Sequence, residues 1–174
     1  MRVRDVTPRR SVSRTARLVP LAACLLVVAS GATAAGATAR DAAPSSLFNT
    51  NSGLCLNVKD NSTTESAPTE IWNCDGRRSE QWQLRDNGTL YNPHSSKCLN
   101  VKDNATFPSA RTEIWFCDDR RSEQWRLYGD GVLHNPNSGL CLNVKDNATY
   151  PSAPTEIWNC DGRHSEVWKR FDPS

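Results

Sequence analysis

Short apolar runs separated by polar, turn-forming residues dominate the chain from residue 46 onward. In the first block the runs cover about 46–49, 54–58, 69–73 and 81–84, with Asn, Asp, Gly, Ser and Pro between them. Runs of this length bounded in this way are typical of β-strands, and no stretch sustains the 3.6-residue period of an amphipathic helix. The pattern therefore predicts an all-β structure with almost no helix.

This block recurs with a period of 43 residues. Residues 46–174 make up three full periods, which we divide into the repeats 46–88, 89–131 and 132–174. Three four-stranded units without helical cover must bury their apolar faces against one another. A closed β-trefoil of about twelve strands with pseudo-threefold symmetry does this and leaves few exposed edges. An open solenoid is the weaker alternative, because three short repeats lack distinct capping units.

The first 39 residues differ from the rest in composition. Residues 1–17 carry six arginines and one acidic residue, an apolar run follows, and small residues surround Ala34 and Ala39. This order is typical of a secretory signal peptide cleaved after Ala34 or Ala39, which leaves residues 40–45 as a short N-terminal segment. An uncleaved anchor is the weaker alternative, because the apolar run falls short of the roughly 20 residues of a spanning helix. We therefore predict a protein secreted from a bacterium, with no membrane association after cleavage.

The charge of the remaining chain narrows the choice of partners. Residues 40–174 hold 15 basic and 18 acidic side chains and so carry a net charge of −3, although the whole chain carries +2. Nucleic-acid-binding proteins normally present a basic surface, so we predict no nucleic-acid partner. Because the repeats occupy all of the chain from residue 46, no room is left for a separate catalytic domain.

Six of the seven cysteines lie in the repeats as three pairs, each separated by 19 positions. Only the repeat singles out one connectivity, namely the disulfides Cys55–Cys74, Cys98–Cys117 and Cys141–Cys160. In the chain-entropy model each closed loop contributes roughly 3 kcal/mol. The chain has no closely spaced Cys-x₂₋₄-Cys pair and no regular histidine spacing, so we predict neither a metal site nor a cofactor.

Side-chain alternation divides the tryptophans of the repeated phrase TEIWNCDGRRSEQW into two kinds. Ile71 is expected to face the core, so Glu70 and Trp72 point away from it. Asn57 lies on the corresponding face of its own strand, and a disulfide within the repeat would bring these two faces together. The second tryptophan shares its face with apolar neighbours and is expected to be buried. The predicted core tryptophans are Trp82, Trp125 and Trp168.

An exposed indole beside an amide and a carboxylate suits a carbohydrate ligand. The C–H face of a pyranose stacks on an aromatic ring, and Asn and Glu oxygens accept hydrogen bonds from hydroxyl groups. The candidate sets are Asn57, Glu70 and Trp72; Asn100, Glu113 and Trp115; and Asn143, Glu156 and Trp158. Recent duplication would also copy these residues without selection for binding, and one sequence does not separate the two explanations.

These residues give the chain a resemblance to the ricin B-type lectins, β-trefoil carbohydrate-binding modules with a repeated QxW signature. The resemblance covers residues 46–174, with three in-phase copies and paired cysteines. It implies one shallow, metal-independent pocket in each repeat, for galactose-type sugars or plant polysaccharides such as xylan. By position it also implies a further polar contact at Ser79, Ser122 and Ser165.

The sequence departs from the family pattern at two positions in every repeat. The QxW glutamine is replaced by Glu80, Glu123 and Glu166, and the pocket aspartate is replaced by Asn57, Asn100 and Asn143. Loss of that aspartate often marks a silent site in the family, although an amide still donates and accepts hydrogen bonds. We expect up to three weak pockets, strengthened on polymeric glycans by roughly 10²-fold through avidity.

A glycosidase and a protein-binding trefoil are the two alternatives to a lectin. A glycosidase needs a pair of carboxylates across one cleft, whereas the carboxylates here recur three times and the three histidines occupy non-equivalent positions. We therefore predict no catalytic residues. A protein-binding trefoil, such as a protease inhibitor or toxin subunit with silent sugar sites, is the main alternative, but the variable loops NSTTESAP, NATFPSAR and NATYPSAP differ only modestly. We expect a monomer that binds carbohydrate.

Overall fold

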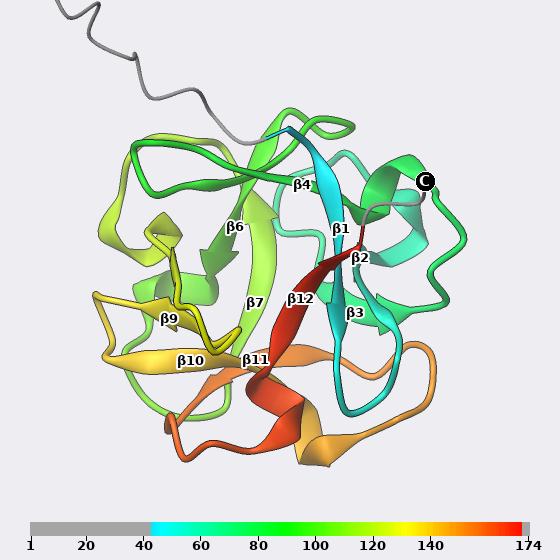
Figure 1. Ribbon diagram of the computed structural model, residues 1–174. Helices are drawn as coiled ribbons and strands as arrows, with labels where there is room; N and C mark the ends of the chain where they lie inside the picture. Colours follow the sequence, from blue (N-terminus) through cyan, green and yellow to red (C-terminus); the bar gives the residue numbers. More distant parts are fainter. Residues whose placement is uncertain (1–42, 172–174) are drawn as a thin grey trace, which may run out of the picture. The chain divides into compact units, whose positions relative to one another are not determined.

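The computed structural model describes residues 43–171, which form twelve β-strands and six single-turn 3-10 helices, with no α-helix among them (Figure 1). The predicted signal peptide and residues 40–42 lie outside the described residues. None of the helices in residues 43–171 is long and apolar enough to cross a membrane. The described residues therefore have the predicted all-β character.

The strands follow the 43-residue repeat. The first repeat contains β1 (Ser45–Asn49), β2 (Cys55–Val58), β3 (Thr69–Trp72) and β4 (Gln81–Leu84). The second contains β5 (Leu90–Asn92), β6 (Lys97–Val101), β7 (Ala110–Trp115) and β8 (Arg126–Leu127). The third contains β9 (Leu133–Asn135), β10 (Leu140–Val144), β11 (Thr155–Trp158) and β12 (Trp168–Phe171). The strand bounds in the first repeat differ from the predicted ones by at most one residue, and β1 starts one residue earlier than predicted, at Ser45.

Six 3-10 helices lie at equivalent places in the three repeats. One follows the second strand of each repeat, as η1 (Lys59–Asn61), η3 (Lys102–Asn104) and η5 (Lys145–Asn147). The other precedes the fourth strand, as η2 (Arg78–Glu80), η4 (Arg121–Glu123) and η6 (His164–Glu166). The chain turns at each of these 3-10 helices, beside the second strand of the repeat. The turns bring loop residues next to the face of that strand that carries the candidate asparagine.

The sheet closes on itself, as a trefoil requires. β1 pairs antiparallel with β12, with Ser46 opposite Phe171 and Asn49 opposite Trp168, and the two strands lie side by side in Figure 1. β1 also pairs with β4, and β7 pairs with β11 of the next repeat. Because the first and last strands are hydrogen-bonded to each other, the open solenoid is excluded.

Three threonines from the three repeats meet at one point in the interior. Each Oγ1 atom of Thr69, Thr112 and Thr155 lies 2.7 Å from the other two. Side chains one period apart come this close only near a threefold axis. The cluster also satisfies the three buried hydroxyl groups, whose burial without partners would cost free energy.

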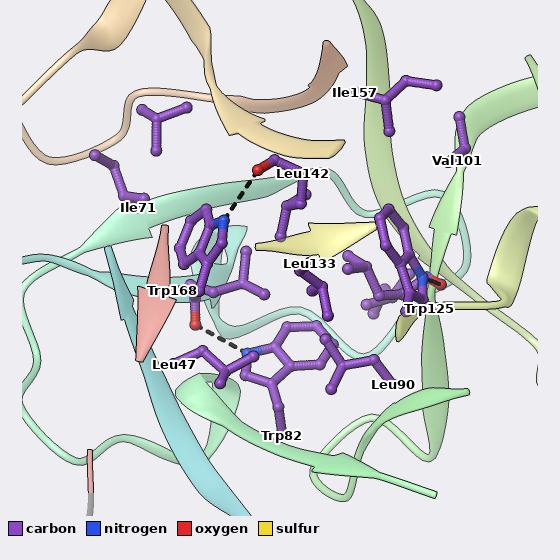
Figure 2. Packing of buried hydrophobic residues seen from close by; sticks show 14 of the residues in the cluster. Leu47, Ile71, Trp82, Leu90, Val101, Trp125, Leu133, Leu142, Ile157 and Trp168 are labelled. Atoms are coloured by element: carbon purple, nitrogen blue, oxygen red, sulfur yellow. Dashed lines mark hydrogen bonds between the residues drawn. The ribbon is translucent and has the colours of Figure 1, made fainter. Parts of the chain in front are cut away.

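The predicted core tryptophans are buried, which Figure 2 shows from close by. Trp82, Trp125 and Trp168 are at most 1% exposed. Each indole Nε1 donates a hydrogen bond to the carbonyl of the leucine 26 positions earlier, at 2.9, 2.9 and 3.0 Å. A buried indole N–H needs such an acceptor. The second tryptophan of the phrase therefore fastens the second strand of its repeat to the core.

The three predicted disulfides are confirmed as Cys55–Cys74, Cys98–Cys117 and Cys141–Cys160. Each one joins the start of the second strand to the loop after the third. The non-core faces of the two strands therefore meet, as strand alternation predicts, and the loop is held against them.

Candidate functional site

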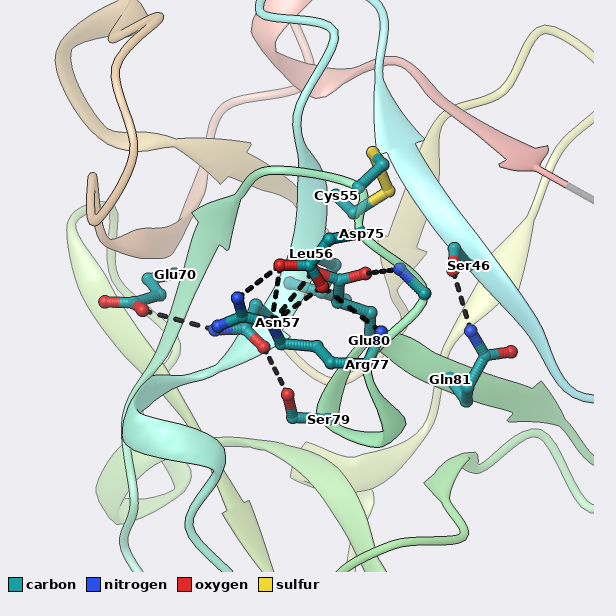
Figure 3. A network of polar contacts seen from close by, with 12 residues as sticks. Ser46, Cys55, Leu56, Asn57, Glu70, Asp75, Arg77, Ser79, Glu80 and Gln81 are labelled. Carbon is teal, nitrogen blue, oxygen red and sulfur yellow. Dashed lines mark hydrogen bonds and ion pairs between the residues drawn. A yellow bond between two sulfur atoms is a disulfide. The ribbon is translucent and has the colours of Figure 1, made fainter. Parts of the chain in front are cut away.

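The floor of the candidate site is an amide–carboxylate pair on neighbouring strands. Asn57 of β2 lies opposite Glu70 of β3, and its Nδ2 donates to Glu70 Oε1 at 3.2 Å (Figure 3). Residues opposite each other in an antiparallel pair project from the same face, so this contact follows from the strand register. The equivalent distances are 3.2 Å for Asn100–Glu113 and 3.3 Å for Asn143–Glu156.

This face is more covered than alternation alone suggests. Asn57 is 1% exposed and Glu70 is 4% exposed, whereas Trp72 is half-buried. We expected an open face and an exposed indole, and both expectations need correction. The disulfide loop and the 3-10 helix η2 lie over the strands and form a second layer, which the strand pattern does not reveal.

The predicted serine contact is also corrected. Ser79 is fully buried, and its Oγ donates to Asn57 Oδ1 at 2.6 Å. The equivalent serines, Ser122 and Ser165, are likewise at most 1% exposed. A hydroxyl group in this place orients the pocket asparagine from behind. We therefore assign Ser79 and Ser122, which bond the pocket asparagines of their repeats, a positioning role in place of direct contact with a ligand.

The three repeats use this serine differently. Ser122 Oγ lies 2.6 Å from Asn100 Oδ1 and 2.5 Å from Asn104 Oδ1. Ser165 instead donates to Asn147 at 2.6 Å, and Asn143 Oδ1 is buried with no hydrogen-bond partner among the described residues. One hydroxyl hydrogen serves one acceptor at a time. The floor is therefore fully bonded in the first repeat and incompletely bonded in the third.

An arginine that sequence reasoning missed lies over the ring of each candidate stacking tryptophan. The guanidinium carbons of Arg77, Arg120 and Arg163 lie 5.3, 5.4 and 5.7 Å from the ring centroids of Trp72, Trp115 and Trp158. This is the distance range of a cation–π contact. An arginine follows the second disulfide cysteine by three positions in every repeat, and that regularity was the available signal.

Each of these arginines is held by an aspartate of the same loop. Arg77 Nε donates to Asp75 Oδ1 at 2.8 Å, and this hydrogen bond lowers the pKa of Asp75. The pairs Arg120–Asp118 and Arg163–Asp161 repeat the contact. The guanidinium group is therefore oriented beside the indole by its own loop.

The glutamates at the QxW position are hydrogen-bonded to the backbone of the loop that carries this arginine and aspartate. Glu80 is fully buried, and its Oε2 accepts the backbone N–H of Gly76 at 3.1 Å. Glu166 accepts the equivalent N–H of Gly162 at 3.1 Å, whereas Glu123 accepts the N–H of Asp118, one position earlier in the loop, at 3.2 Å. In all three, Oε1 is buried with no hydrogen-bond partner within residues 43–171.

Burial makes these glutamates unusual acids. Desolvation, followed by the charge of Asp75, raises the pKa of Glu80 to about 7. Desolvation and the charge of Asp118 likewise raise the pKa of Glu123 to about 7, and the pKa of Glu166 is raised for the corresponding reasons. Burial also raises the pKa of Glu70 on the pocket floor. With a pKa of about 7, the carboxyl groups of Glu80 and Glu123 change charge near neutral pH.

An open cavity of about 340 Å³ lies beside the predicted residues of the second repeat. It is lined by Ser66, Asn100, Asp103, Asn104, Glu113, Trp115 and Arg120. The structure thus brings together Asn100, Glu113 and Trp115, three of the four residues predicted for this repeat, whereas Ser122 does not line the cavity. The lining also includes Asp103 and Asn104 from η3 and a serine from the first repeat. A volume of this size lies at the low end of the range for small-molecule sites.

Two lysines complete the rim in the second and third repeats. Lys102 Nζ lies 3.3 Å from Glu113 Oε2, and Lys145 Nζ lies 3.6 Å from Glu156 Oε2. Among residues 43–171, no group of three or more His, Cys, Asp or Glu side chains is placed to hold a metal ion. The site therefore offers an aromatic face with hydrogen-bond donors and acceptors of both charges around it.

Comparison with known proteins agrees with this geometry. The family model of the ricin-type β-trefoil lectin domain matches residues 43–168. The designed three-fold symmetric protein ThreeFoil is 28% identical, with a TM-score of 0.71 over 74% of this chain and 98% of that chain. No curated protein sequence matches this chain.

Two natural proteins with solved structures are also similar. The exo-β-1,3-galactanase 1,3Gal43A from Clostridium thermocellum is 25% identical, with a TM-score of 0.70 over 75% of this chain but only 30% of that chain. The agglutinin from Abrus precatorius is 21% identical, with a TM-score of 0.68 over 77% of this chain and 49% of that chain. At that identity the agglutinin supports the fold alone.

Proposed function

The chain belongs to the ricin-type β-trefoil lectin domain family, and from this membership we propose that its three repeats bind carbohydrate without a metal ion. The ligands are galactose-type sugars or plant polysaccharides such as xylan. Each pocket uses a half-buried tryptophan as the stacking surface and an asparagine–glutamate pair as the hydrogen-bonding floor. The protein acts as a monomeric lectin and not as an enzyme.

The cavity of the second repeat is the observation that carries this proposal. Trp115, Asn100 and Glu113 line the same 340 Å³ space, although they come from two strands. Asn104 and Asp103 add oxygen atoms to the same lining. An aromatic face flanked by amide and carboxylate groups matches a pyranose, which has an apolar C–H face and polar hydroxyl edges.

The similarity to 1,3Gal43A supports galactose-type ligands in particular. That protein is an exo-β-1,3-galactanase, and this chain matches 30% of its length. The proposal for this chain concerns recognition only, since three copies of a binding pocket supply no unique pair of catalytic carboxylates. Release of reducing sugar from galactan or xylan by the purified protein would contradict it.

The compartment is part of the proposal. Three disulfides form and persist in oxidising surroundings, which agrees with the signal peptide predicted from residues 1–39. We therefore place the protein outside the cell. Because one chain carries three weak pockets, its affinity for a polymeric glycan would be roughly 10²-fold higher than its affinity for a single sugar.

The direct test replaces Trp72, Trp115 and Trp158 by alanine together. Affinity gels containing β-1,3-galactan or xylan should retain the wild-type chain and release the triple variant. Tyr128→Ala is the matched control, because it removes another aromatic ring, 48% exposed, that lies outside the three pockets. Near-ultraviolet circular dichroism checks the fold of each variant. Equal retention of the triple variant would show that the pocket assignment is wrong.

A further inference from the structure

The turn before the third strand of each repeat lies against the pocket strand of a neighbouring repeat. Ser66 N–H donates to the carbonyl of Ile114 at 3.0 Å, Ser109 N–H to Ile157 at 2.9 Å, and Ser152 N–H to Ile71 at 2.8 Å. Each of these isoleucines comes directly before a pocket tryptophan. The turn of one repeat is therefore fixed beside the stacking residue of another.

The cavity of the second repeat shows what this arrangement does. Ser66, which belongs to the first repeat, lines the cavity together with Trp115. The same backbone hydrogen bonds place the turn of the second repeat beside Trp158 and the turn of the third repeat beside Trp72. Each pocket is thus bordered by residues that another repeat supplies.

These turns share one backbone geometry and differ at their first residue. They cover Thr64–Ala67, Phe107–Ala110 and Tyr150–Ala153, and in each the alanine N–H lies 3.4 Å from the carbonyl of the first residue. The third residue is a serine with φ between +59° and +69°, which is the geometry of a type II turn. In the second and third repeats a proline at the second position fixes φ further.

The first residue of the turn is aromatic in two repeats only. Phe107 and Tyr150 are each 63% exposed, whereas Thr64 stands at this position in the first repeat. Phe107 is two residues from Ser109, a chain span of at most about 7 Å. An exposed aromatic side chain on a turn whose serine is hydrogen-bonded to the residue before the pocket tryptophan is placed to contact a ligand that extends beyond the pocket.

We propose that Phe107 and Tyr150 are second aromatic platforms, for the Trp158 pocket and the Trp72 pocket respectively. These two pockets bind at least two linked sugar units of a glycan chain, one on each aromatic ring. The Trp115 pocket, which is bordered by Thr64, binds a single unit. This inference rests on the proposed carbohydrate binding, and it specifies the ligand as an oligosaccharide chain.

The test separates the three pockets by leaving one intact in each background. The backgrounds are W115A/W158A, W72A/W115A and W72A/W158A, which retain the pockets of Trp72, Trp158 and Trp115. Calorimetry then gives the affinity of each for galactose and for β-1,3-linked galactotetraose, and for xylose and xylotetraose. The Trp72 and Trp158 pockets should prefer the tetrasaccharide by about fivefold, the size of one added aromatic contact, and the Trp115 pocket should show no such preference.

Substitutions in the turns assign that preference to the rings. Y150T in the Trp72 background and F107T in the Trp158 background should abolish the preference and leave the monosaccharide affinity unchanged. F116T is the matched control, because it removes an exposed ring beside Trp115 that is not on a turn, and it should change neither value in these two backgrounds. T64Y/E65P should create the preference in the Trp115 pocket.

The outcomes distinguish this inference from the proposed function. An unchanged preference in Y150T and F107T, or an equal preference in all three pockets, overturns the second platforms and leaves the lectin proposal standing. Wild-type protein that binds none of the four sugars, or a triple tryptophan variant that binds them as well as wild type does, overturns both.

Discussion

The core tryptophan and the pocket tryptophan of each repeat come from one repeated phrase, but their surroundings differ in regularity. Around Trp82, Trp125 and Trp168 the three repeats are alike, with full burial and the same hydrogen bond within 0.1 Å. Around Trp72, Trp115 and Trp158 the serine bonds, lysine contacts and bordering turns all differ. Close packing of large apolar side chains accepts few arrangements, whereas small polar side chains can exchange hydrogen-bond partners with little change in packed volume. The core therefore preserves the threefold symmetry, and the pockets are free to diverge.

The strongest test of this comparison replaces one tryptophan of each kind in the same repeat. Trp125→Ala should lower the free energy of unfolding by about 3 to 5 kcal/mol, because it leaves a cavity in the core and an unpaired leucine carbonyl. Trp115→Ala should cost less than about 1.5 kcal/mol, because its ring is half-buried at the surface and leaves no enclosed cavity. Urea denaturation measures both. Similar losses for the two variants would mean that the pocket tryptophan is also a core residue.

A second test uses the buried glutamates, which lie between the core tryptophans and the loops beside the pocket tryptophans. The pKa of Glu80 and that of Glu123 are raised from 4.5 to about 7 in the folded chain. Unfolding therefore releases protons between pH 4.5 and 7, so stability should be greatest near pH 4.5 and fall as the pH rises through 7. Replacing Glu80, Glu123 and Glu166 by glutamine should flatten this slope and stabilise the protein at pH 8, on the order of 1 kcal/mol for each of Glu80 and Glu123.

Thermal denaturation of the glutamine variant and wild type across pH 4.5 to 8 measures this effect. A conservative control is Glu65→Gln, which removes an exposed carboxylate and should leave the slope unchanged. An identical pH dependence in the triple glutamine variant and wild type would show that these carboxyl groups titrate normally.

The smallest expected effect compares the polar floors of two pockets. Ser122→Ala removes the hydroxyl group that lies 2.6 Å from the buried Oδ1 of Asn100 and leaves that oxygen without its donor, so it should cost about 1 to 3 kcal/mol. Ser165→Ala removes one contact, in a floor where Asn143 Oδ1 already has no partner among the described residues, so it should cost about 1 kcal/mol. Chemical denaturation compares the two variants. A larger loss for Ser165→Ala would contradict the difference between these floors.

Much of the site was predictable because it depends on local rules. The contact between Asn57 and Glu70 follows from strand alternation together with the register that the disulfide imposes. The arginine over each pocket tryptophan was not predicted, although its fixed spacing after the second cysteine was visible. Spacing places a residue in a loop, but the loop conformation decides where its side chain lies. That conformation depends here on the buried glutamate that accepts the loop N–H.

The sequence by itself determined the repeat, the strand positions, the disulfide pairs and the division of the tryptophans. These depend on contacts within one repeat, which alternation and the 43-residue period make regular. Only the tertiary structure decided that the serines are buried and that the turn of one repeat borders the pocket of another. These features arise where the closed sheet brings residues of different repeats or layers together. No periodicity along the chain specifies those contacts, because packing in three dimensions sets their geometry.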